Sequence, residues 1–122
     1  MAYITDVAFD AALAVVIDSS ALFICSQEPT TYAQATSTYA LGTKASPTLG
    51  AAADRTPNGR KTTVSAITDG TVSGTGTATH WALVKATGSL LRATGALSAS
   101  QAVTSGNTFT LAAFDVGIPD AV

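Results

Sequence analysis

Charge is the most conspicuous shortage in this chain of 122 residues. Six basic and eight acidic side chains make up 11% of the chain, against an average of about 25% for soluble domains. Nucleic-acid binding requires a cluster of positive side chains, which six scattered bases cannot form, so we expect no nucleic-acid partner. The mean hydropathy is +0.34 and the net charge only −2, which excludes a charged, disordered tail.

Cysteine and histidine occur once each, at Cys25 and His80. One cysteine excludes a disulfide framework or a zinc cluster within a single chain. A Cys25–His80 dyad would need the two side chains adjacent and the thiol exposed, but Cys25 lies in an apolar run typical of a small buried residue. No carboxylate flanks His80, and Asp69, Asp115 and Asp120 lie near predicted turns or the chain end. We therefore predict no enzyme, and no catalytic residue, cofactor site or metal site.

Long hydrophobic runs are also missing. The longest, Ala11 to Ile17, is far shorter than the roughly 20 residues that span a membrane. A signal peptide is not expected either, because the first ten residues hold Asp6 and Asp10 and no base, and Asp18 interrupts the apolar stretch. We expect a chain that is made and folded in the cytoplasm and has no membrane partner.

Small and β-branched residues are abundant where charged residues are scarce. Alanine, threonine, serine and glycine occur 24, 20, 11 and 10 times, which is just over half of the chain. A surface this poor in charge is typical of a protein whose faces are covered by neighbours. We therefore expect a homo-oligomer in which each subunit buries more than ~800 Å² through apolar contacts with few ion pairs. A general bias of the source proteome toward alanine and threonine is the alternative explanation.

The first half of the sequence predicts helix and irregular structure around one strand. A helix is expected from Thr5 or Asp6 to about Ser19, with its apolar face at helical spacing: Phe9, Leu13, Val16 and Ile17. Residues 21–27 are typical of a strand. Residues 30–41 favour a helix ending at Gly42, and residues 43–59 are the least regular part.

The second half alternates with a period of two residues, which predicts strands. Strands are expected over residues 61–68, 71–85, 90–97 and 108–116, with turns at 69–70, 87–89 and 105–107 and a bulge at Ala112-Ala113. In the second strand, Trp81 and Leu83 should share one face, and the opposite face should hold Ala78, Ala82 and Val84. We expect Trp81 and Leu83 to be buried with Phe109 and Leu111.

These elements predict a mainly β fold of the α+β class: a small antiparallel β-sandwich with an N-terminal helix and an irregular central loop. Residues 1–122 should form a single domain, with a helical and irregular part at 1–59 and the sandwich at 60–122. Residues 1–20 and 43–59 would then be free to contact neighbours. Half of the basic residues lie in one predicted loop: Arg55, Arg60 and Lys61. This loop is either a solvated turn or a contact to an acidic neighbour.

From Lys61 onward the chain resembles the small β-rich structural proteins of tailed-phage virions. The resemblance lies in residues 74–84 (GTGTATHWALV), in Leu90-Leu91, in residues 96–103 (ALSASQAV) and in the closing residues 106–111 (GNTFTL). It implies a head decoration, cement or tail-associated protein, located in the virion and assembled in the host cytoplasm. The implied partners are further copies of the chain, the major capsid protein or other virion proteins.

Two other functions compete with capsid decoration. A tail or head-fibre component that contacts the host surface would expose aromatic side chains on loops, and Tyr32, Tyr39 and Trp81 are the candidates. A small carbohydrate-binding module would need a cleft with convergent polar groups, and the sequence contains no pattern that predicts one.

Overall fold

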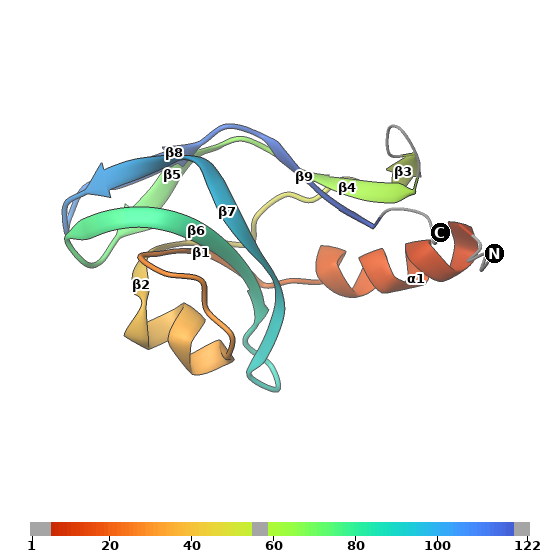
Figure 1. Cartoon of the computed structure of the whole chain (residues 1–122), viewed down its shortest axis with the longest axis horizontal. Coiled ribbons are helices and arrows are strands. Elements are labelled where there is room, and N and C mark those ends of the chain that lie inside the picture. Colours follow the sequence, from red (N-terminus) through yellow and green to blue (C-terminus); the bar gives the residue numbers. More distant parts are fainter. Residues whose placement is uncertain (1–5, 55–58, 119–122) are drawn as a thin grey trace.

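The computed structural model describes residues 6–54 and 59–118 (Figure 1). One α-helix and one π-helical turn accompany nine β-strands. Their bounds are α1 Asp6–Ile17, β1 Ala21–Cys25, η1 Gln34–Thr38, β2 Ala40–Ala45, β3 Ala53–Asp54, β4 Arg60–Val64, β5 Ile67–Val72, β6 Gly76–Lys85, β7 Leu90–Val103, β8 Thr108–Leu111 and β9 Phe114–Ile118.

The strands form two antiparallel sheets. The larger has the order β7-β6-β1-β2-β5-β8, and the smaller has the order β3-β4-β9. The larger sheet curls, so that β7 approaches β8 from the opposite end of the strand order (Figure 1). The predicted mainly β, α+β fold with antiparallel sheets and an N-terminal helix is confirmed.

The part expected to be helical and irregular, residues 1–59, contributes two strands to the larger sheet. β1 and β2 belong to the first half of the chain, yet they occupy the centre of the larger sheet, between β6 and β5. β1 carries an unbroken apolar run, Leu22 to Cys25, because both of its faces are covered. The β-structure therefore needs residues 21–45.

The main core fills the inside of the curled sheet. Trp81, Leu83, Phe109 and Leu111 all belong to it, which confirms their predicted burial and proximity. Ala78 also belongs to it, and the prediction that Ala78 faces the same side as Ala82 is wrong. The change of face along β6 occurs where the β6–β7 register shifts, between Ala78 and His80.

A second, smaller core lies on the other face of β1 and β6. Cys25, Ala35, Ala82 and Val84 are its buried members, and Tyr32 and Tyr39 pack against them at half-buried positions. η1 contributes Ala35. The helix expected over residues 30–41 is thus shorter, and Gly42 does not end it but pairs with Val72 inside the sheet.

Two predicted strands are each divided between the two sheets. The strand expected over residues 61–68 breaks after Val64 and resumes at Ile67, and the one expected over 108–116 breaks at Ala112-Ala113. The breaks coincide, because Val64 pairs with Phe114 and Ile67 with Leu111 on either side of them. At Ala112-Ala113 the chain therefore crosses between sheets instead of forming a bulge within one strand. Asp69 and Gly70 lie in β5 and do not form the predicted turn.

The remaining turns follow the glycines. Gly88 and Ser89 have φ values of 87° and 54° and close the β6–β7 hairpin as predicted. Gly106 has a φ of 90° in the turn predicted at residues 105–107. This turn joins β7 to β8, which lie at opposite ends of the sheet order, so it is not the hairpin turn that the sequence predicted.

α1 is an integral part of the folded unit. Its predicted apolar face is confirmed, since Phe9 and Leu13 are buried and Val16 packs against the main core. Arg60 of β4 donates to Asp10 of α1 from Nε at 2.8 Å. The helix is therefore packed against the sheets and is not the free segment that the sequence predicted.

Candidate functional site

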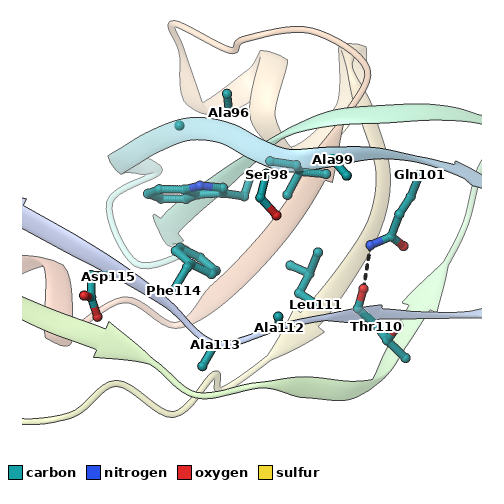
Figure 2. Close-up of a pocket in the computed structure, with 13 residues that line it drawn as sticks. Ala96, Ser98, Ala99, Gln101, Thr110, Leu111, Ala112, Ala113, Phe114 and Asp115 are labelled. Carbon is teal, nitrogen blue, oxygen red and sulfur yellow. Dashed lines mark hydrogen bonds between the residues drawn. The ribbon is translucent and has the colours of Figure 1, made fainter.

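A groove of about 570 Å³ lies between β7 on one side and β8 with the start of β9 on the other (Figure 2). Most of its lining side chains are small and uncharged. They are Trp81, Gly95, Ala96, Leu97, Ser98, Ala99, Gln101, Thr110, Leu111, Ala112, Ala113, Phe114 and Asp115. No pattern in the sequence predicted this groove.

An irregularity in β7 accompanies the groove. The β6–β7 register passes from Ala78 opposite Gln101 to His80 opposite Ala96. Four residues of β7, 97–100, thus stand opposite the single residue Thr79. A bulge of this kind bends the strand that carries it. Three of these four residues, Leu97, Ser98 and Ala99, line the groove.

Both rims of the groove are end strands. β7 and β8 end the larger sheet, and β9 ends the smaller one. Gln101 of β7 bridges the rims, because its Nε2 donates a hydrogen bond of 2.6 Å to the backbone oxygen of Thr110 in β8 (Figure 2). A side-chain amide therefore satisfies an edge carbonyl that a neighbouring strand would otherwise engage.

Aromatic rings close one part of the groove. Trp81 and Phe114 are in contact, with ring centroids 4.8 Å apart and ring planes at 39°. Gly95 is opposite Trp81 in the β6–β7 register, and a Cβ atom on it would lie 2.7 Å from Cζ2 of the indole. Glycine at position 95 therefore lets β7 approach the ring closely. Only 7% of Trp81 is exposed.

Asp115 is the one charged residue in the lining of the groove. Its carboxylate accepts hydrogen bonds from Thr63 Oγ1 at 2.7 Å and from Lys61 Nζ at 3.0 Å. These two hydrogen bonds lower the pKa of Asp115. The carboxylate is thus ionised near neutral pH and already paired within the chain, so the groove offers no unpaired charge to a ligand.

Cys25 and His80 are closer than the sequence indicated, because they are opposite one another in the β1–β6 register. Their hydrogen bonds nevertheless go elsewhere: the Cys25 thiol donates to the Ala35 oxygen at 3.6 Å, and His80 Nδ1 lies 2.9 Å from Thr79 Oγ1. Burial raises the pKa of the Cys25 thiol to about 11. A buried thiol with a raised pKa is the opposite of an activated nucleophile. The predicted burial of Cys25 is confirmed.

Cys25 should therefore resist thiol reagents in the folded protein. At pH 8 we expect labelling by 5,5′-dithiobis(2-nitrobenzoic acid) to be slow in buffer and fast in 6 M guanidinium chloride, because only unfolding exposes the thiol. Free cysteine in the same buffer serves as the control for reagent activity. Rapid labelling in native buffer would show that Cys25 is accessible and would contradict its place in the second core.

Arg60 and Lys61 form ion pairs within the chain. Arg60 and Lys61 lie in β4 rather than in a loop, and Arg55 lies outside the described residues. Arg60 binds Asp10 of α1 and Asp54 of β3, and Lys61 binds Asp115 of β9. For Arg60 and Lys61, ion pairing within the subunit replaces the solvated turn or the acidic neighbour that the sequence indicated.

The outer face of α1 is a second uncharged surface. Every exposed side chain of residues 7–17 is apolar: Val7, Ala8, Ala11, Ala12, Ala14 and Val15. Val7 is 78% exposed and Val15 is 45% exposed. A helix on the surface of a monomer usually has charged and polar residues on its outer face. The outer face of α1 therefore differs from that of an ordinary surface helix.

Within residues 6–54 and 59–118, histidine, cysteine and acidic side chains form no cluster of three that could hold a metal ion. In the same part of the chain, no helix is both long and apolar enough to cross a membrane.

Comparisons with protein-family models, with curated proteins and with solved structures find no match to this chain.

Proposed function

We propose that this chain is a non-enzymatic structural protein of a tailed-phage virion, which decorates or cements the capsid by binding further copies of itself and the major capsid protein. The observation that carries the proposal is the outer face of α1, where every exposed side chain of residues 7–17 is apolar. An apolar helix face is normally covered, because helix faces in contact with water usually carry charged and polar residues. The resemblance of residues 74–84, which include most of β6, to small phage structural proteins supports a virion as the assembly.

The proposed mechanism is binding alone. Apolar and threonine-rich surface is removed from water where subunits meet, and this burial favours the assembled state. The exposed part of β7 fits the same role, since Arg92 is the only charged residue of this 14-residue edge strand and its Leu90 is 44% exposed. Natural edge strands usually carry charges that prevent association, and β7 has almost none.

Capsid decoration has more support than either competing function. None of the aromatic side chains considered for host contact is fully exposed, since Tyr32 and Tyr39 pack against the second core at half-buried positions and Trp81 lies in the main one. Carbohydrate-binding sites usually offer an aromatic ring face to the sugar. Trp81, at the groove, is 7% exposed and already lies against Phe114 and Gly95.

The test is self-association of the purified chain, measured by sedimentation velocity over a range of concentrations. We expect the wild-type chain to form an oligomer. Ala14→Lys on the outer face of α1 should dissociate this oligomer, because burying an ammonium group at the subunit interface costs free energy. Ala66→Lys is the matched control: Ala66 is exposed in the segment between β4 and β5, and this variant should assemble like the wild type.

A wild-type chain that remains monomeric at high concentration and does not bind phage particles would contradict the proposal. Equal dissociation by Ala14→Lys and Ala66→Lys would contradict the assignment of the contact to α1. Circular dichroism of both variants verifies that the lysines leave the fold intact.

A further inference from the structure

We propose that the groove between β7 and β8–β9 binds an extended, uncharged segment of a partner polypeptide, which adds as a β-strand between the two rims. The inference goes beyond the proposed virion role and does not depend on it. It follows from the backbone edges, the charge and the dimensions of the groove.

The groove is bordered by the open edges of β-strands. The strands that border the groove are β7 and β8 at the ends of one sheet and β9 at the end of the other. An end strand presents a row of backbone donors and acceptors along its outer side. The hydrogen bond from Gln101 Nε2 to the Thr110 oxygen shows that at least one of these acceptors faces β7 across the gap. A strand laid in the groove could use both rims, which is the recognition mode called β-augmentation.

The absence of charged side chains on the rims favours an uncharged occupant. Residues 95–101 of β7 and residues 108–114 of β8–β9 contain no charged side chain. Asp115, at the end of the second stretch, is already bound to Lys61 and Thr63. A charged side chain entering the groove would lose hydration and gain no counter-charge, which is costly. The segment that fits is therefore uncharged.

The dimensions set the length and the side chains of the segment. Residues 108–114 of the β8–β9 rim extend over at most about 20 Å at roughly 3.3 Å per residue, which matches a segment of about seven residues. The β7 rim is shorter because of its bulge: Gly95 and Gln101 stand opposite Trp81 and Ala78, which are three residues apart in β6. Ala96, Ala99, Ala112 and Ala113 have small side chains, so a backbone can approach both rims. Alternate side chains of the occupant would point toward Trp81 and Phe114, which favours apolar residues at those positions.

Other occupants fit less well. A helix, such as α1 of a second copy, has its backbone groups paired internally and would leave both rims without hydrogen bonds. A sugar would find little aromatic face, because Trp81 is already covered by its neighbours.

The experiment uses the full-length chain and a panel of blocked seven-residue peptides that alternate threonine with valine or alanine. Binding is followed by amide chemical shifts and by hydrogen exchange in nuclear magnetic resonance spectra. We expect at least one peptide to bind and to protect backbone amides within residues 97–101 and 108–114. The same peptide with proline at alternate positions lacks half of its N–H donors and should bind at least tenfold more weakly.

Three variants locate the site. Ala99→Trp fills the groove and should abolish binding, whereas Ala102→Trp is the matched control, since Ala102 is exposed in β7 and does not line the groove. Gln101→Ala frees the Thr110 carbonyl for the incoming strand and should strengthen binding several-fold. A site that recognised its ligand through the Gln101 side chain would instead lose affinity. Thermal unfolding of each variant checks that the fold is retained.

Failure of every uncharged peptide to protect these amides would overturn the proposal, as would equal binding of the proline peptide. Concentration-dependent protection of the same amides without peptide would show that copies of the chain fill the groove themselves, which also overturns it. Ala14→Lys should leave peptide binding unchanged, so the groove and the assembly through α1 can fail separately.

Discussion

Replacing Trp81 by alanine is expected to lower the free energy of unfolding by about 3–5 kcal/mol, because truncation of a large buried aromatic leaves a cavity that the core cannot fill. Trp81 lies in the main core, contacts the Phe114 ring and lies under Gly95. Both hydrophobic transfer and packing are thus lost together. Urea denaturation gives the difference in the free energy of unfolding. Unfolding is followed by circular dichroism, because Trp81→Ala removes the one tryptophan whose fluorescence could report it.

Leu90→Ala is the control for Trp81→Ala. Leu90 is a large apolar residue of β7 that is substantially exposed, so its truncation should change the free energy of unfolding by less than about 0.5 kcal/mol. A loss below about 1 kcal/mol for Trp81→Ala, in the range of surface substitutions, would contradict the burial of the indole.

Replacing Gly70 by alanine is expected to destabilise the chain by about 1–3 kcal/mol through overpacking. A Cβ atom at Gly70 would overlap the ring of Phe109, which is almost fully buried. The ring also packs closely over Gly42 on the neighbouring strand, where an added Cβ atom would lie 3.1 Å from its Cδ1. Two glycines on adjacent strands thus form the recess that holds Phe109.

Gly74→Ala is the matched control for this prediction, because its new Cβ atom would lie 3.6 Å from Leu41 Cδ2, an ordinary contact distance. Phe109→Leu in the Gly70→Ala background should recover part of the loss, since neighbouring substitutions are not additive. Chemical denaturation of the four proteins gives the values. Equal stability of Gly70→Ala and Gly74→Ala would show that Phe109 does not fill the recess.

The sequence predicts local elements well where one pattern dominates. α1 follows from helical spacing of its apolar residues, and the β6–β7 hairpin follows from alternation around a glycine turn. β2 was missed because residues 30–42 contain a helical turn directly followed by a strand, and the tyrosine spacing favours helix across both. The apolar pattern of residues 108–116 does locate the break at Ala112-Ala113, but it cannot distinguish a bulge from a crossing between sheets.

The groove could not be predicted for a different reason. It depends on which strands end each sheet, and this is set by contacts between distant segments such as β5 with β8 and β4 with β9. It also depends on the four-residue irregularity in β7 opposite Thr79, and residues 97–100 contain no glycine, proline or asparagine that would indicate an irregularity there. The only indication in the sequence is a strand-like stretch, 93–104, without charge. Such a stretch indicates a covered edge without identifying what covers it.

Electron microscopy of tailed-phage particles that contain this chain with a small tag, decorated with gold-labelled antibody, tests the central proposal most directly. We predict label distributed over the whole head in many copies per particle, because the chain would bind wherever capsid subunits meet. Label at one vertex or along the tail would assign it to the tail or to a head fibre. Purified particles that carry no label, in cells that produce the tagged chain, would contradict a structural role in the virion.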